Sequence, residues 1–422
     1  MMWNKVLGSA LGVLWLAGAA GATNSTAAYV TLDFNTMAGI RGVTTENAVT
    51  KLGATGGGDP RYVTFEKNGV PKVLYREFQT GDAPDTVTVF DPTRWSIPEA
   101  NTTFGKNIGG AAVSGTFLFL ANYYNDGQGH SYLTKHDMND PNYRQVDARN
   151  LDDGDATNLV EYVKDVLAWK DALYVLVERR DNSWPINFAP SALVRFNAQL
   201  AETGSVDLGK NASSMALGKD SIYITVMGGA RNASGNSSLV AVDPATLAKT
   251  VVGSSRDLPQ PYAFDQVGVA PDGTLFVTGY YNDAVVWPAP NPCKVFTAAP
   301  GTPRAFVERD TLPGWVSKGL FDGTGNCFWV VHHGTGTGNS SLVAYDAQGN
   351  RVRNFSETTL GGMVYDATPV TSPATPTTTP TPTLTPPASG GSGGGGGCVA
   401  GTLGTPWALL LLLPACFLRR QW

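Results

Sequence analysis

Large polar and aromatic side chains recur at one equivalent place in an internally repeated chain. They stand directly after six similar apolar segments, as Arg76-Glu77, Tyr123-Tyr124, Glu178-Arg179-Arg180, Met227-Gly228, Tyr280-Tyr281 and His332-His333. Tyr and Arg are enriched at binding hot spots, and Arg with aromatic rings suits anionic or sugar-like ligands. Tyr and His can also serve as general acid and base. We predict a ligand-binding site whose members are Tyr124, Arg179, Tyr280 and His332.

A structural interpretation of the same residues stays open. The Tyr rings could pack between neighbouring repeats, and the charged groups could pair with each other. Side chains alternate along a strand, so only one member of each adjacent pair can face a common centre.

The spacing of the His and Asp residues gives little support to a metal or cofactor site. The four histidines are His130, His136, His332 and His333, and the adjacent pair cannot both point at one ion from a strand. Asp152-Asp153-Gly154-Asp155 has carboxylates suited to Ca²⁺ but lacks the full spaced loop, which favours a solvated turn. No G-x-S-x-G, P-loop or Rossmann motif occurs in a strand-turn-helix context. We therefore predict no metal and no cofactor.

Two internal repeats indicate the architecture that positions these residues. The segment Gly235–Asp243 (GNSSLVAVD) recurs almost unchanged at Gly338–Asp346, 103 positions later, and Tyr123-Tyr124-Asn125-Asp126 recurs 157 positions later at Tyr280. Both offsets are close to multiples of about 52, and periods of this order are typical of propellers and solenoids.

Each repeat reads as four short strands. The predicted second strands are Val70–Phe78, Thr116–Tyr123, Ala172–Val177, Ser221–Val226, Thr274–Thr278 and Cys327–His332. Asp272-Gly273 between apolar runs is a hairpin turn signal. Six such units predict an all-β, six-bladed β-propeller, with the strand Ala28–Asp33 completing the last blade. A seven-bladed ring is the alternative, because residues 28–57 and 355–366 could form an extra blade. The pattern resembles NHL or YVTN-like bacterial propellers in architecture only.

The two ends of the chain predict export. Residues 1–22 resemble a secretory signal peptide, with Lys5, an apolar stretch and Ala20-Gly21-Ala22 before the cleavage point. Residues 23–366 form the predicted propeller domain, and residues 367–397 a Thr/Pro and Gly-rich linker that cannot bury a core. Residues 398–422 hold an apolar stretch long enough to cross a bilayer, followed by Arg419-Arg420.

This tail resembles the bacterial sorting signals called Synerg-CTERM, which are analogous to GlyGly-CTERM tails. The resemblance is carried by Ser392, Gly393 to Gly397, Cys398, Ala400-Gly401, Pro406, Leu409 to Leu413, Pro414 and Arg419-Arg420. It implies recognition by an intramembrane protease, processing at Gly397 and Cys398, and transfer to the cell surface. A single-span anchor that is never cut is the alternative. In both cases the protein would be exported to the cell envelope and membrane-anchored at its C-terminus, at least transiently.

The net charge and the number of cysteines argue against two classes of protein. The net charge is −5 without a basic cluster, which argues against nucleic acid as a partner. Only four cysteines occur, two of them in the tail, so this is not a disulfide scaffold. Two functions remain: a surface propeller that binds an unknown extracellular ligand or partner at the channel mouth, or an extracellular propeller enzyme, a lyase or hydrolase acting on saccharide or peptide.

Overall fold

The computed structural model describes residues 26–369, apart from 33–38, 45–48, 55–57, 79–84, 91–97, 124–130, 153–158, 182–185, 230–235, 261, 281–291, 303, 323–326 and 335–338. These residues belong to one compact unit, Met1–Thr375. The predicted signal peptide and tail lie outside the described residues, and so does the predicted linker except for its first three residues, which end strand β28 (Val364–Pro369).

The described chain forms seven four-stranded antiparallel sheets, here called blades. Blade 1 contains β4 (Gly58–Lys67), β5 (Val70–Phe78), β6 (Thr86–Phe90) and β7 (Pro98–Thr103). Blade 2 contains β8 (Ile108–Ser114), β9 (Phe117–Asn122), β10 (Tyr132–Asp137) and β11 (Gln145–Asn150). Blade 3 contains β12 (Val160–Trp169), β13 (Ala172–Arg180), β14 (Pro190–Phe196) and β15 (Glu202–Lys210).

The next three blades repeat this order. Blade 4 contains β16 (Ala212–Leu217), β17 (Ile222–Val226), β18 (Ser238–Val242) and β19 (Lys249–Ser254), followed by the 3₁₀ turn η1 (Ser255–Asp257). Blade 5 contains β20 (Ala263–Val269), β21 (Leu275–Tyr280), β22 (Cys293–Ala298) and β23 (Val307–Leu312). Blade 6 contains β24 (Trp315–Phe321), β25 (Cys327–Gly334), β26 (Ser341–Asp346) and β27 (Arg351–Ser356), followed by helix α1 (Glu357–Leu360).

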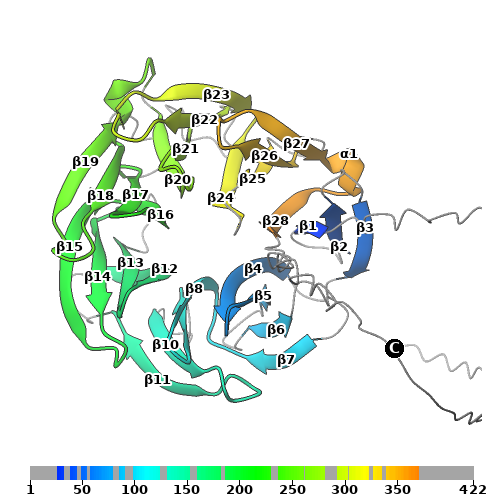
Figure 1. Ribbon diagram of the computed structural model, residues 1–422, viewed down its shortest axis with the longest axis vertical. Helices are drawn as coiled ribbons and strands as arrows, with labels where there is room; N and C mark the ends of the chain where they lie inside the picture. Colours follow the sequence, from blue (N-terminus) through cyan, green and yellow to red (C-terminus); the bar gives the residue numbers. More distant parts are fainter. Residues whose placement is uncertain are drawn as a thin grey trace, which may run out of the picture. The chain divides into compact units, whose positions relative to one another are not determined.

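Blade 7 joins the two ends of the domain. It contains β28 together with β1 (Thr26–Leu32), β2 (Gly39–Thr44) and β3 (Val49–Ala54), and β1 pairs antiparallel with β28. The first strand of every blade, or β28 in blade 7, is innermost. These inner strands contact one another in the order β28, β4, β8, β12, β16, β20, β24 and back to β28, so the ring is closed (Figure 1).

The predicted all-β propeller is therefore confirmed, and the six repeat units correspond to blades 1–6. With the seventh sheet the ring has seven blades, as in the seven-bladed alternative. The strand predicted at Ala28–Asp33 is observed as β1, and it does latch the ring, but within this additional blade rather than within the last repeat unit. Closure through a strand from each end removes open sheet edges at the join.

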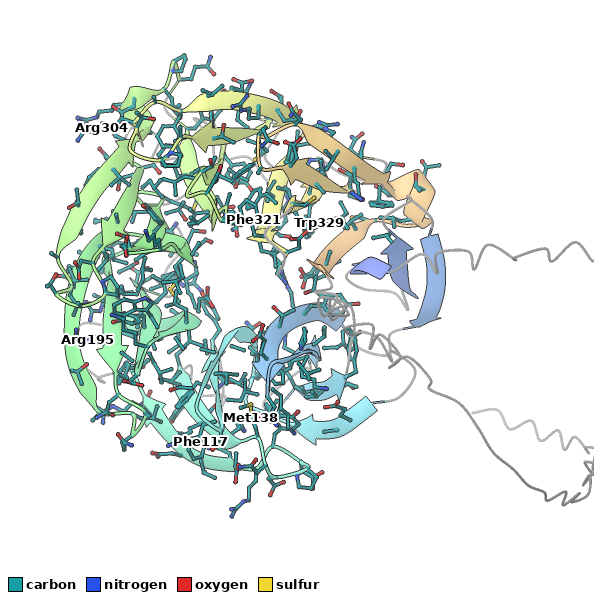
Figure 2. All side chains as sticks on the ribbon, in the orientation of Figure 1. Phe117, Met138, Arg195, Arg304, Phe321 and Trp329 are labelled. Carbon is teal, nitrogen blue, oxygen red and sulfur yellow. The ribbon has the colours of Figure 1, made fainter. Side chains whose placement is uncertain are left out.

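Apolar side chains between neighbouring blades hold the ring together. Six hydrophobic clusters each combine residues of two adjacent blades, such as Phe119 with Val163, or Phe276 with Phe328. Figure 2 shows side chains filling the spaces between the sheets, with Trp329 in the cluster that joins blades 6 and 7. Cys293 in β22 and Cys327 in β25 are both free thiols.

Candidate functional site

The inner strands surround a central cavity of about 490 Å³. All seven inner strands contribute to its wall. Arg76, Asn107 and Tyr123, which lie outside these strands, also line the cavity. A cavity of this size suits a small ligand.

Every inner strand carries a β-bulge where it lines this cavity. The register against the second strand shifts between Ile108 and Gly110 in β8, between Val163 and Asp165 in β12, and between Val316 and Lys318 in β24. Equivalent shifts occur in β4, β16 and β20, and at the pairing of β28 with β1. A bulge re-aims side chains and interrupts strict alternation, so adjacent residues such as Lys164 and Asp165 both line the cavity.

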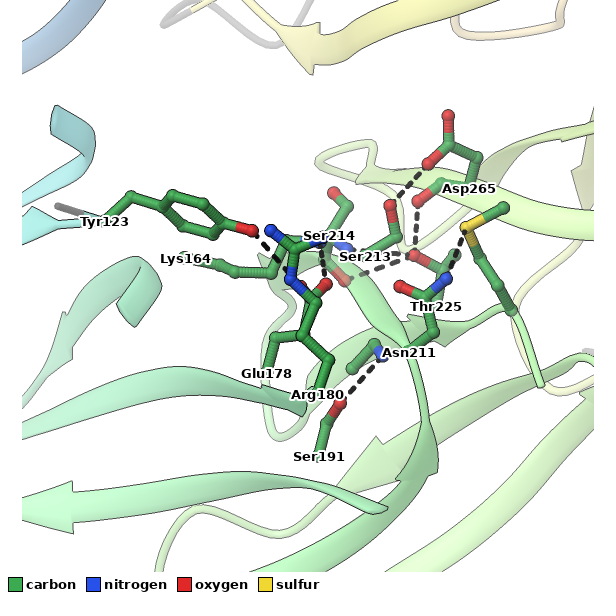
Figure 3. Close-up of polar contacts among 12 residues, drawn as sticks. Tyr123, Lys164, Glu178, Arg180, Ser191, Asn211, Ser213, Ser214, Thr225 and Asp265 are labelled. Carbon is green, nitrogen blue, oxygen red and sulfur yellow. Dashed lines mark hydrogen bonds and ion pairs between the residues drawn. The ribbon is translucent and has the colours of Figure 1, made fainter. Parts of the chain in front are cut away.

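At two of these bulges, a side chain of the second strand accepts a hydrogen bond from a backbone N–H group. The Thr225 hydroxyl accepts from the Ser214 N–H at 3.2 Å, and the Thr278 hydroxyl accepts from the Gln266 N–H at 3.1 Å. Ser213 donates to the carboxylate of Asp265 in the neighbouring blade (Figure 3). The bulges are thus fixed parts of the wall.

On the blade 3 side of the cavity, one buried carboxylate forms ion pairs with two cations. Glu178 pairs with Lys164 at 2.8 Å and with Arg180 at 3.2 Å, and it accepts from the Tyr123 hydroxyl at 3.3 Å (Figure 3). Tyr123 stacks on Tyr162 with ring centroids 4.5 Å apart. Lys164 therefore has an ion-pair partner inside the protein, which it shares with Arg180.

Between blades 6, 7 and 1, a buried carboxylate likewise pairs with a lysine of the cavity wall. Lys318 in β24 donates to the Tyr62 carbonyl at 2.8 Å and lies 3.4 Å from the Asp366 carboxylate, which also accepts from the Tyr62 N–H at 2.7 Å. Burial lowers the pKa of Lys318, and the charge of Asp366 opposes that shift. Arg61 donates to the Tyr365 hydroxyl at 3.1 Å and lies over its ring.

Asp165 differs from the other carboxylates of the wall. Its Oδ1 accepts from the N–H of Val166 at 2.8 Å, while no cation in the described part of the chain lies within ion-pair distance and Oδ2 has no hydrogen-bond partner there. Burial raises the pKa of Asp165 to about 7, although the Val166 N–H and the charges of Lys318 and Lys164 act against the shift. A carboxyl group that titrates near neutrality in a cavity is a candidate functional group.

The structure places the described members of the predicted ligand site outside the central cavity. Tyr124 lies outside the described residues. Arg179 pairs with Glu161 at 2.6 Å and approaches Asp207 at 3.4 Å. The Tyr280 side chain is buried, and its hydroxyl bonds the backbone of Val316 in the next blade. Of the four, none that the structure describes lines the central cavity.

His332 is also part of the interior. It is 1% exposed, its Nε2 contacts the Pro313 carbonyl, and its Nδ1 lies 3.2 Å from the Ser341 hydroxyl. Burial lowers its pKa, so the ring is neutral at neutral pH. Tyr280 and His332 are therefore buried rather than exposed at the channel mouth, and Tyr280 fits the interpretation that Tyr rings pack between repeats. Gly397 and Cys398, the predicted processing positions, lie outside the described residues.

Within the described ranges no group of three His, Cys, Asp or Glu side chains is placed to hold a metal ion. Most of the Asp152–Asp155 segment lies outside those ranges. No helix described by the structure is long and apolar enough to span a membrane.

Sequence reasoning missed the inner-strand residues that form the wall. A signal existed: the charged residues Glu161, Lys164 and Asp165 interrupt the mainly apolar strand Val160–Trp169, and Lys318 interrupts Trp315–Phe321. Charged residues within a buried strand mark a special environment.

The fold is shared with solved structures of low sequence identity. Comparison of the sequence with protein-family profiles and with curated proteins gave no match. The periplasmic gluconolactonase of Pseudomonas aeruginosa is 13% identical with a TM-score of 0.55, over 82% of this chain and 99% of that one. A candidate 6-phosphogluconolactonase of Bacteroides fragilis is 11% identical with a TM-score of 0.54, over 83% and 99% of the two chains. These similarities show the propeller fold.

Proposed function

We propose that this protein is an exported propeller that binds a small, polyhydroxylated, sugar-like ligand in its central cavity. The observation that carries the proposal is the Asp165 carboxylate, which lines the cavity without an ion-pair partner in the described chain. Its Oδ2 can accept a hydrogen bond, and a ligand hydroxyl can supply one.

The charge balance of the wall favours a neutral ligand over a strongly charged one. Lys164 is paired with Glu178, Lys318 with Asp366, and Arg76 with Asp85. Apart from Asp165 and from Arg61, which donates to the Tyr365 hydroxyl, the remaining polar lining consists largely of hydroxyl and amide groups, including Ser213, Ser317 and Gln266. Such groups both donate and accept hydrogen bonds, as sugar hydroxyls do. Two propellers of similar fold are named for sugar-lactone substrates, which supports the same ligand class.

The test is direct binding to the full-length protein in detergent. Saturation-transfer NMR with glucose, galactose, N-acetylglucosamine and gluconate should give signals with the wild-type protein. Asp165→Ala should weaken the affinity of the bound sugar by at least about tenfold, the equivalent of a hydrogen bond to a charged group. Asp171→Asn is the matched control, because Asp171 is exposed at the other end of the same hairpin. Equal binding by the wild type and Asp165→Ala would place the ligand elsewhere.

We also propose that residues 398–422 sort the protein to the cell surface after cleavage by an intramembrane protease. The order of the glycine run, Cys398, apolar stretch and Arg419-Arg420 supports this proposal. Cys398→Ala should change the mass of the mature C-terminus and reduce surface delivery in fractionated cells. An unchanged mass and distribution would leave a simple membrane anchor as the better description.

A further inference from the structure

Asp165 and Lys318 reach the central cavity from opposite sides of the ring. Their strands, β12 and β24, are separated by two inner strands in one direction and by three in the other (Figure 1). Both residues line the cavity, and the charge of each influences the ionisation of the other. A ligand held between them meets a carboxylate on one side and an ammonium on the other.

Both groups have hydrogen-bonding capacity left for a ligand. Asp165 Oδ2 has no hydrogen-bond partner among the described residues. Lys318 uses its ammonium for the Tyr62 carbonyl and Asp366, while its side chain remains 24% exposed. Because an ammonium has three N–H groups, one is available to an oxygen in the cavity.

We propose that the cavity hydrolyses a carboxylic ester carried by the sugar-like ligand, with Asp165 as general base and Lys318 stabilising the oxyanion. This proposal rests on the proposed binding function. Asp165 takes a proton from water as the water oxygen bonds to the ester carbonyl carbon. The carbonyl oxygen becomes an oxyanion beside the Lys318 ammonium. When the oxyanion collapses, the ester C–O bond breaks and the departing alkoxide takes the proton from Asp165, which yields an acid and an alcohol.

The residues of the wall favour an ester over a glycosidic bond. Glycosidic hydrolysis needs two carboxyl groups with separate roles. The second carboxylate that lines the cavity, Asp366, already accepts from the Tyr62 N–H and pairs with Lys318. One carboxylate and one cation are sufficient for general-base attack on an ester. The Asp165 pKa of about 7 suits a general base at neutral pH.

The experiment measures hydrolysis of 4-nitrophenyl acetate and glucono-1,5-lactone by the full-length protein in detergent. The wild type should exceed the buffer rate, and its kcat/KM should rise with pH through an apparent pKa near that of Asp165. Asp165→Asn keeps a similar shape and hydrogen-bonding capacity but cannot accept the proton. It should lose about 10²- to 10⁴-fold in kcat while sugar binding by NMR stays within a few-fold of the wild type.

Two further variants complete the design. Asp171→Asn, the same chemical change outside the cavity, should hydrolyse both esters at the wild-type rate. Lys318→Gln should lower kcat and move the pH midpoint upward, because the Lys318 charge acts against the raised pKa of Asp165. Wild-type rates for Asp165→Asn at every pH would overturn the proposal. If sugars bind to the wild type but neither ester is hydrolysed above the buffer rate, hydrolysis is rejected and the binding function stands. If the wild type neither binds sugars nor hydrolyses either ester above the buffer rate, both the binding function and the hydrolysis proposal are rejected.

Discussion

Asp165 occupies the space that a side chain at Gly110 would need. A Cβ built on Gly110 would lie 1.9 Å from Asp165 Oδ1 and 3.0 Å from the Val166 nitrogen. The glycine in β8 therefore allows the carboxylate of β12 to sit against the neighbouring inner strand. Gly110→Ala should displace this carboxylate, weaken ligand binding, and reduce the free energy of unfolding by about 1–3 kcal/mol through overpacking. Denaturant melts together with sugar-binding NMR measure both effects.

Gly115→Ala is the control for that substitution. Gly115 lies in the turn that follows β8, has a φ of +60°, and has nothing within 4 Å of a built Cβ. An alanine there should cost about 1 kcal/mol through backbone strain and leave sugar binding unchanged. If both variants bind like the wild type, the contact between Gly110 and Asp165 does not govern the site.

Tyr280 and Arg179 should respond differently to substitution. The buried Tyr280 hydroxyl bonds both the N–H and the carbonyl of Val316, so Tyr280→Phe leaves two backbone groups without that partner. We expect a loss of about 1–3 kcal/mol in the free energy of unfolding. The Arg179 side chain is 33% exposed and screened by solvent, so Arg179→Ala should cost no more than about 1 kcal/mol. Equal losses in denaturant melts would contradict this contrast.

The local features of the fold and a latching strand could be predicted from the sequence, but the number of blades could not. The repeated GNSSLVAVD segments contain the third strands β18 and β26, and the Asp272-Gly273 turn joins β20 to β21, with Gly273 at a φ of +88°. Each depends on neighbours within one hairpin. Blade 7 instead pairs Tyr29 with Thr368, which no local period connects. The number of blades was therefore the part of the architecture that sequence left open.

The candidate site was predicted less well, because its geometry depends on the bulges. Strict alternation sends Lys164 and Asp165 to opposite faces of a sheet. The register shift between Val163 and Asp165 instead places both in the cavity wall. Tyr280, at the end of a second strand, was more conspicuous in the sequence but serves packing between blades.

His136 should make the fold sensitive to acid. Its ring is buried between the Tyr143 carbonyl and the Thr134 hydroxyl, and burial lowers its pKa from 6.5 to about 4. Below pH 6.5 the unfolded chain binds a proton that the folded protein does not, so this contribution to stability is complete above pH 6.5 and declines as the pH falls toward 4. His136→Gln should flatten the pH dependence of the unfolding free energy in that window by up to about 1.4 kcal/mol per pH unit. An unchanged slope would show that His136 titrates normally.

Asp165 should have the opposite effect in an overlapping range of pH. Its folded-state pKa is raised from 3.8 to about 7, so between these values the folded protein binds a proton that the unfolded chain has lost. Stability contributed by this group is therefore present at low pH and declines as the pH rises toward 7, by less than about 1.4 kcal/mol per pH unit because the side chain is partly solvated.

Asp165→Asn removes this titration without removing the side chain. The unfolding free energy of the variant minus that of the wild type should therefore increase as the pH is raised from 4 to 8, and it should level off above the folded-state pKa. Asp171→Asn, exposed at the turn of the same hairpin, should give a nearly constant difference. Urea melts at half-unit pH intervals measure both differences. A flat difference for Asp165→Asn would mean that the carboxylate is ionised throughout this range, and it would remove the support that its pKa gives to a general-base role.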